Sequence, residues 1–225
     1  MFEGLPITYP YWKDYFLIIL VAGLLAVLRA YYQNPRLFVR LLKSTFSKNE
    51  TEKLRDDKQN TLSQRNAIIL NLVFLVNLGM MMFLAIKYHS LSLPPHPEMI
   101  NFLIVFSVIA GYYLIRIVLY HLVGFLTYAG EIQATYTQAW MGLNKWFGLL
   151  LFPAIAGMLY FPPEAGNIII FLFAGLFVLL FLIKVYRGLQ IAFANRISFI
   201  IIFLYLCALE LLPVFVLLKY ITGII

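Results

Sequence analysis

One acidic residue stands near the middle of a long apolar stretch late in the chain. Glu210 lies within the run from Ile197 to Ile221, and Pro213 follows three positions later. A charged side chain at the centre of a bilayer costs roughly 3 kcal/mol or more, so Glu210 is a candidate proton or cation site. A helical proline displaces the carbonyl four residues earlier, here that of Leu209, and leaves a free acceptor beside Glu210. The alternative is a structural polar tie between helices.

Other polar side chains inside the apolar runs are candidate partners for that carboxyl group: Asn71, Asn77, Arg116 and His121. Opposite charges at membrane depth usually pair, which makes Arg116 a candidate partner, although its depth on its helix differs from that of Glu210 and an anchor at the inner interface is its favoured role. A protonated Glu210 that donates to the Leu209 carbonyl or to Asn77 is the alternative. Asn71 is expected to hydrogen-bond between helices, and His121 to lie at an interface.

A second candidate site lies in the polar stretch 124–144. Thr127, Glu131, Thr135 and Gln138 recur there at helical spacing. Either the preceding apolar helix continues past the membrane surface, or an amphipathic helix lies against the cytoplasmic end of the bundle. Both interpretations bring Glu131 and Gln138 to the inner interface, where a lipid-modifying enzyme would need its polar groups.

Motifs of established chemistry do not occur in the sequence. It has no nucleotide-binding loop, nucleophile elbow, zinc-protease helix or paired carboxylates. His89, His96 and Glu98 share one loop without a standard metal-ligand spacing. Cys207 is the only cysteine, which excludes an intrachain disulfide. We therefore expect no cofactor, no metal and no enzymatic activity.

The composition requires a membrane environment. Of 225 residues, 63% are hydrophobic and 12% are charged, and the mean hydropathy is +0.88. Soluble proteins have about half apolar and about a quarter charged residues. The net charge of +7 comes from basic residues in short segments between apolar runs, which favours a role in membrane orientation over nucleic-acid binding.

The apolar runs predict an all-α, polytopic transmembrane helical bundle that forms a single membrane domain over residues 1–225. A helical span takes about 20 apolar residues, and six segments approach that length. They are residues 15–32, 67–87, 100–123, 145–161, 167–187 and 197–221. The fourth is short and contains Gly148, Pro153 and Gly157, so a five-span or re-entrant arrangement is the alternative.

The basic residues predict the orientation. With the N-terminus outside, only Lys13, Lys87 and Lys219 of the 17 lysines and arginines fall on the outer side, and with six spans the C-terminus is outside as well. The remaining basic residues include those of a cytoplasmic loop at residues 33–66. A helix there would turn Arg36, Arg40 and Lys43 toward anionic lipid headgroups.

The two predicted outer loops share a Pro-Glu-x-x-Asn pattern, at Pro97–Asn101 and Pro163–Asn167. The offset of 66 residues aligns spans two and three with spans four and five, as a parallel internal repeat would. The alternative is that the pattern starts a helix well in both places.

Two short segments carry a family resemblance. Tyr205–Pro213, which reads YLCALELLP, and the later Lys219 resemble the closing motif of a bacterial integral-membrane family known as domain of unknown function 4271. Asn144–Pro153, with Gly148 inside it, resembles a second element of that family. The resemblance extends from Ala67 to the C-terminus. It implies an inner-membrane protein without an assigned activity, and it transfers no catalytic residue.

These observations favour a multi-pass protein of the bacterial inner membrane that acts as a non-enzymatic subunit, scaffold or assembly factor. Its expected partners are anionic lipid headgroups and either another membrane protein or further copies of itself, and not nucleic acid. The first alternative is a small proton-coupled transporter or channel that uses Glu210. The second is a lipid-modifying enzyme.

Overall fold

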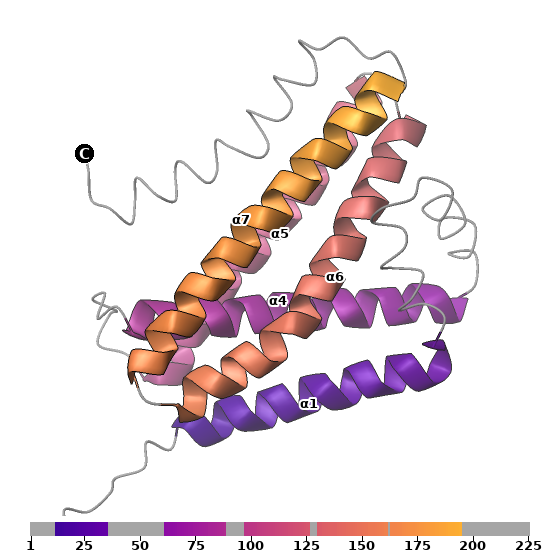
Figure 1. Cartoon of the computed structure of the whole chain (residues 1–225). Helices are drawn as coiled ribbons and strands as arrows, with labels where there is room; N and C mark the ends of the chain where they lie inside the picture. Colours follow the sequence, from indigo (N-terminus) through magenta and orange to yellow (C-terminus); the bar gives the residue numbers. More distant parts are fainter. Residues whose placement is uncertain (1–11, 36–60, 89–96, 127–129, 162, 195–225) are drawn as a thin grey trace, which may run out of the picture.

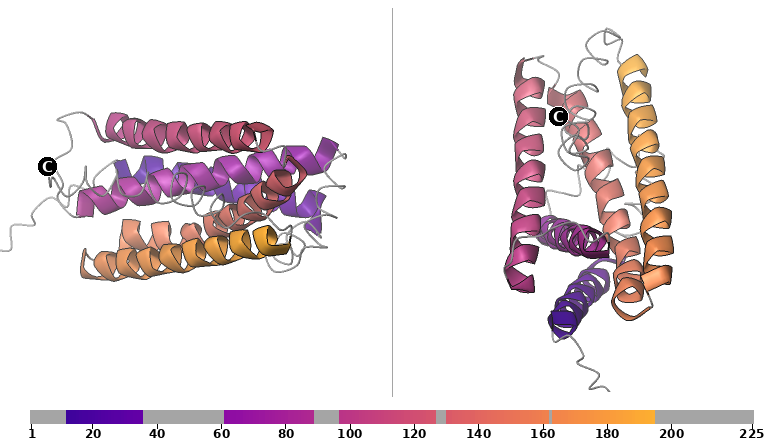
Figure 2. Two further views of the ribbon diagram at one scale, coloured as in Figure 1. Left: turned by 90° about the horizontal axis from the view of Figure 1, so that it is seen from above. Right: turned by 90° about the vertical axis from the view of Figure 1, so that its left-hand side faces the viewer.

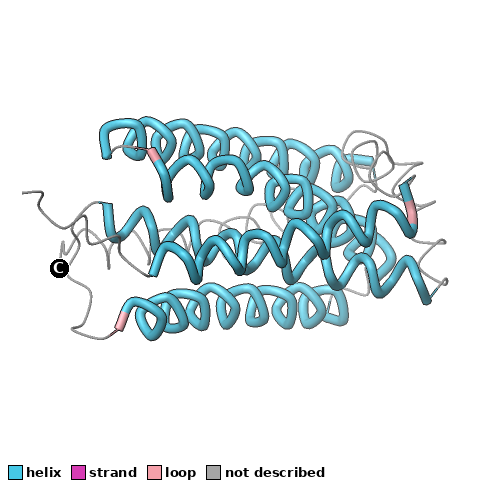
Figure 3. Tube along the Cα trace, turned by 90° about the horizontal axis from the view of Figure 1, so that it is seen from below, coloured by secondary structure: helices cyan, strands magenta, loops and turns pink. Residues whose placement is uncertain are grey.

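The computed structural model describes residues 12–35, 61–88, 97–126, 130–161 and 163–194. These residues form long α-helices, and no strand occurs among them (Figures 1 and 3). The helices are α1 (Trp12–Gln33), α4 (Thr61–Tyr88), α5 (Glu98–Leu126), α6 (Gly130–Tyr160) and α7 (Pro163–Ala194). Each contains an apolar segment long enough to cross a bilayer. The chain is therefore an all-α protein with five candidate membrane spans in its described part.

Each described helix overlaps one of the first five predicted spans and extends beyond it at one or both ends. The prediction followed apolar runs, whereas the backbone hydrogen-bond ladder of a helix continues into the polar residues that flank such a run. The sixth predicted span, residues 197–221, lies outside the described residues.

The largest difference from the prediction concerns the polar stretch 124–144. The structure contains neither a separate surface helix there nor a long extension of α5, because α5 ends at Leu126 and α6 runs without interruption from Gly130 to Tyr160. A continuous buried stripe explains this: Trp140, Leu143, Phe147 and Leu151 follow one another at spacings of three and four residues. Because the stripe passes directly into the apolar run, one helix buries all of it. That helix also continues through Pro153.

Helix α4 is the central element of the bundle. It contacts α1, α5 and α6, and more weakly α7. Viewed from above, it lies between α5 and the pair formed by α6 and α7 (Figure 2, left). Helix α1 runs beside α4, whereas α5, α6 and α7 slant across them (Figure 1). Most of the span in α6 is buried, but none of the span in α7 is.

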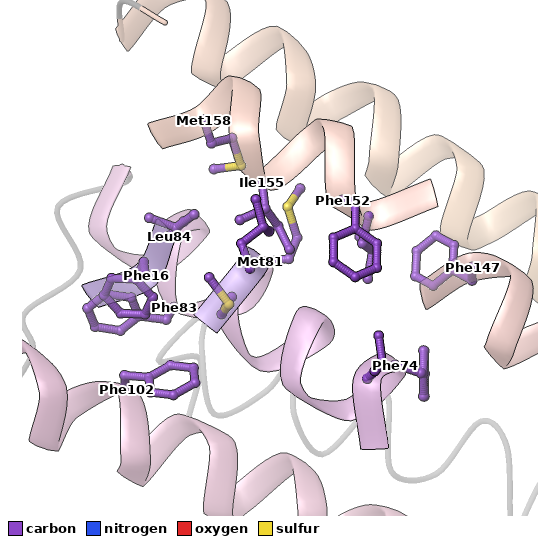
Figure 4. Close-up of a cluster of buried hydrophobic side chains, with 14 of the residues drawn as sticks. Phe16, Phe74, Met81, Phe83, Leu84, Phe102, Phe147, Phe152, Ile155 and Met158 are labelled. Atoms are coloured by element: carbon purple, nitrogen blue, oxygen red, sulfur yellow. The ribbon is translucent and has the colours of Figure 1, made fainter. Parts of the chain in front are cut away.

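An aromatic cluster joins α1, α4 and α5 near one end of the bundle. The rings of Phe16 and Phe83 are stacked with their centroids 5.3 Å apart, and Phe102 meets Phe16 edge-on at 5.2 Å (Figure 4). Ile155 and Met158 of α6 belong to the same buried core. Aromatic pairs of this kind contribute about 1 kcal/mol beyond the area they bury, so the cluster fixes how these helices meet.

Candidate functional site

Polar and aromatic side chains of α5, α6 and α7 converge on the indole ring of Trp140. The guanidinium carbon of Arg116 lies 4.5 Å from the ring centroid, and the ammonium nitrogen of Lys184 lies 5.3 Å from it. The neighbouring Asn144 accepts a hydrogen bond of 2.9 Å from that same ammonium group. We refer to the following residues as the Trp140 cluster: Tyr113, Arg116, Trp140, Asn144, Lys145 and Lys184.

The positions of these residues along their helices explain why they meet. Arg116 is ten residues before the end of α5, Trp140 is ten residues after the start of α6, and Lys184 is ten residues before the end of α7. Ten residues correspond to about 15 Å of helix. Since α5 and α7 end on the side where α6 begins, the three side chains lie in one layer.

The cluster combines deep burial with positive charge. Trp140, Asn144 and Lys145 have only 2%, 4% and 6% of their surface exposed. A cation held over an aromatic ring gains about 1–2 kcal/mol when it is shielded from water, so Trp140 stabilises both Arg116 and Lys184. Both cations, Trp140 and Lys145 make further interactions beyond these contacts.

Tyr113 extends the cluster toward the central helix. Its ring is nearly parallel to that of Trp140, with the centroids 5.3 Å apart, and its other neighbour is Phe74 of α4 at 6.1 Å. Asn144 and Arg116 lie within electrostatic reach of its hydroxyl group. Through Tyr113, the cluster therefore connects side chains of four helices, α4, α5, α6 and α7.

A second polar contact joins α4 to α6. The side-chain nitrogen of Asn77 donates a 2.9 Å hydrogen bond to the carbonyl oxygen of Gly148. A Cβ atom on Gly148 would lie 2.8 Å from the Cα atom of Phe74, so only glycine allows the two helices to come this close. The amide of Asn77 is thus directed toward the backbone of α6.

Further contacts join the helices at the end of the bundle away from the Trp140 cluster. The hydroxyl group of Tyr88 donates a 2.6 Å hydrogen bond to the carbonyl oxygen of Met158, and the Tyr88 ring occupies the space that a Cβ atom on Gly166 would need. Lys87 and Glu98 form an ion pair of 2.5 Å between α4 and α5. These contacts bring the ends of four helices together.

The remaining predicted site residues do not join the Trp140 cluster through any contact described above. Asn71 is half-buried, and its side-chain oxygen has no hydrogen-bond partner among the described residues. His121 is exposed, and its Nδ1 donates to the Ile117 carbonyl oxygen of its own helix at 2.9 Å. Gln138 is half-buried, with a side-chain oxygen that also lacks a partner in the described part of the chain.

Glu131 lies in the first turn of α6, about 14 Å along the helix from Trp140.

Several predicted residues lie outside the described part of the chain: Glu210, Pro213, Arg36, Arg40 and Lys43. His89 and His96 do as well, and the described ranges hold no group of three metal-ligating side chains.

Sequence reasoning missed most of the Trp140 cluster. It counted Lys145 and Lys184 only among the basic residues that set the membrane orientation, and it did not single out Trp140. Their common depth was not visible in the sequence, because the predicted spans end seven residues after Arg116 and three residues after Lys184, whereas α5 and α7 each end ten residues after them. Asn144 and Lys145 also belong to a segment that the family resemblance had singled out.

Comparison with known proteins identifies a family but no function. No curated protein and no solved structure matches the chain. A family model described as "Domain of unknown function (DUF4271)" matches residues 16–221. The match confirms the resemblance seen in the two sequence segments and begins earlier than expected, within α1. Since it spans nearly the whole chain, the protein belongs to the DUF4271 family.

Proposed function

We propose that this protein is a non-enzymatic subunit, scaffold or assembly factor of a membrane complex. The observation that supports this proposal is that polar side chains in the helices form hydrogen bonds to neighbouring helices. Asn77 and Tyr88 both donate to backbone carbonyl groups of α6, and Lys184 bonds to Asn144. Their hydrogen-bonding capacity serves to hold helices together, as expected of a protein whose task is to present a stable surface.

The outward faces of α5 and α7 support a partner within the membrane. Large apolar side chains such as Ile115 and Phe171 are well exposed on them. A Cβ atom on Gly111 or Gly175 would meet nothing within 4 Å. Small residues on a lipid-facing surface let another helix approach closely, and this is how many membrane helices associate.

We further propose that the chain crosses the bacterial inner membrane six times, with both termini outside. The distribution of lysine and arginine supports this orientation. In this topology Arg36, Arg40 and Lys43 contact anionic headgroups on the cytoplasmic side.

The test is the mass of the particle that this protein forms in a native-like membrane. We expect extraction in lipid nanodiscs, followed by native mass spectrometry, to give a stoichiometric complex larger than one chain. Gly175→Leu should reduce the retained partner, whereas Leu25→Phe, on an exposed part of α1, should not. A single chain in every preparation would contradict the proposal.

The second candidate is proton-coupled transport through Glu210. It is favoured by the charged groups of the Trp140 cluster, because buried ionisable residues in membrane helices often mark ion pathways. Transport predicts that Glu210→Gln abolishes pH-dependent flux in proteoliposomes. Unchanged flux would contradict the transport function and would not affect the proposal of a non-enzymatic subunit, scaffold or assembly factor.

A further inference from the structure

The Trp140 cluster lies at the boundary of the candidate membrane spans. The apolar segment of α5 ends at Leu119, that of α6 begins at Trp140, and that of α7 ends at Tyr186. Arg116 is three residues before the first of these limits, and Lys184 is two residues before the last. The rise of a helix places both cations about 3–5 Å inside the boundary. This is the level at which the headgroups of a phospholipid leaflet meet the hydrocarbon layer.

Arg116 and Lys184 are the most accessible members of the cluster. Both residues are half-buried, whereas Trp140, Asn144 and Lys145 are buried. The two cations approach one indole ring from α5 and α7, and these helices stand on either side of α6 at this end of the bundle (Figure 2, right). A ligand that reaches the cluster from the surrounding bilayer therefore meets two positive charges first.

These two side chains can hold several acceptors at once. A guanidinium group has five N–H donors, and an ammonium group has three. Lys184 donates to Asn144, and both cations take part in other interactions within the chain. A phosphate group presents several oxygen atoms as acceptors, and arginine and lysine both bind it well, so it suits this combination of donors.

Exposed apolar side chains continue from both cations toward the middle of the bilayer. Val108 is eight residues before Arg116 and is 60% exposed, and Phe177 is seven residues before Lys184 and is 46% exposed. Residues seven or eight positions apart lie on one side of a helix, so each apolar side chain lies about 10–12 Å deeper than its cation. An acyl chain attached to a headgroup at the two cations would run along this apolar surface.

We propose that Arg116 and Lys184 bind the phosphate-bearing headgroup of an anionic phospholipid, whose acyl chains lie on the exposed faces of α5 and α7. Basic residues between membrane helices commonly hold such headgroups at this level. The lipid belongs to the leaflet on the side where α5 and α7 end, and it connects these two helices across Trp140. Its binding does not depend on whether the protein also has a protein partner.

Native mass spectrometry of the full chain in detergent measures this binding. We expect phosphatidylglycerol to bind several-fold more tightly than phosphatidylcholine with the same acyl chains. Arg116→Gln and Lys184→Gln should each lower this preference about fivefold, because one cation near the membrane surface contributes about 1 kcal/mol to the binding of anionic lipid. Lys184→Arg keeps the charge and should retain the preference. Since the preference is a ratio of two affinities of the same protein, a lower stability of one variant does not alter it.

Arg29→Gln is the matched control. Arg29 is an exposed cation of α1, and its removal should leave the preference for phosphatidylglycerol unchanged. Equal affinities of the unsubstituted protein for the two lipids overturn the proposal. Equal losses in the glutamine variants of Arg29, Arg116 and Lys184 also overturn it, because they would indicate a general attraction between a basic protein and anionic lipid. A loss of the preference in Lys184→Arg overturns it as well.

Inorganic phosphate distinguishes a lipid site from a site for a soluble anion. It carries the negative charge without an acyl chain, so an excess of it should not displace phosphatidylglycerol from the unsubstituted protein. Displacement of the lipid by phosphate overturns the proposal, because the two cations would then bind a soluble anion.

Discussion

The side-chain nitrogen of Asn77 lies 2.9 Å from the carbonyl oxygen of Gly148, beside the place where the backbone of α6 meets Phe74 of α4. The hydrogen bond from Asn77 and the absence of a side chain at Gly148 therefore act together where α4 crosses α6. These two helices pack more extensively than any other pair among the described residues. The first two predictions separate their contributions.

Gly148→Ala should destabilise the protein. The new methyl group would lie 2.8 Å from the Cα atom of Phe74, and a backbone atom cannot move aside as a flexible side chain can. Overpacking of this kind costs about 1–3 kcal/mol. Thermal unfolding in detergent measures the loss. Gly111→Ala is the matched control: it has open space around it, so the higher helix propensity of alanine should leave stability unchanged or slightly raised. Equal stability of the two variants would show that the helices are not held this closely.

Asn77→Ala should lower stability by about 1 kcal/mol, because it removes a hydrogen bond between buried groups of two helices. Asn71→Ala, six residues earlier on α4, should have a smaller effect because no hydrogen bond to the Asn71 oxygen is formed among the described residues. Unfolding of both variants in the same detergent gives the comparison. The reverse order would contradict the role assigned to Asn77.

Tyr88→Phe should weaken the end of the bundle opposite the Trp140 cluster. It removes the 2.6 Å hydrogen bond to Met158 but keeps the ring that packs on Gly166, so a loss of about 1 kcal/mol is expected. Amide hydrogen exchange near the end of α6 should increase at the same time. Tyr160→Phe, at an exposed position, is the control and should change neither quantity. Unaltered exchange in Tyr88→Phe would contradict the stabilising role of the hydrogen bond from Tyr88 to the Met158 carbonyl group.

Phe16→Ala should be the most damaging of these substitutions. Phe16 is 1% exposed and contacts the rings of both Phe83 and Phe102, so its truncation leaves a cavity and costs about 3–5 kcal/mol. Ile18→Ala, two residues later on the lipid-facing side of α1, should cost far less. The midpoint of denaturation in detergent distinguishes them. A small effect of Phe16→Ala would mean that α1 is not fixed by this cluster.

The helices were predictable because membrane spans are encoded locally. About twenty apolar residues in a row identify a span without any knowledge of its neighbours, and the first five runs all correspond to described helices. The polar first half of α6 was not predictable in this way. Its residues from Gly130 to Lys145 resemble those of a surface helix until the buried stripe through Trp140 is seen against α5 and α7.

The candidate site was harder to predict than the helices. Arginine, lysine and tryptophan near the ends of apolar runs are the ordinary signs of an interface, and composition alone does not separate an anchoring Lys184 from one that is packed on Trp140. The distinction depends on contacts between residues 24–44 positions apart, such as Arg116 with Trp140 and Trp140 with Lys184. The ends of the predicted spans, at residues 123 and 187, place Arg116 and Lys184 at different depths, and only the observed helix ends place them in one layer.

The helices α5, α6 and α7 are longer than a bilayer span requires. These helices contain 29, 31 and 32 residues, about 43–48 Å each, while the hydrocarbon layer is about 30 Å thick. The apolar windows end at Leu119, at Trp140 and at Tyr186, so most of the excess length lies at the same end of all three helices. The three helices therefore continue together beyond their apolar windows on one side, and the Trp140 cluster lies where those windows end, so it joins the helices at the boundary between their apolar and polar parts.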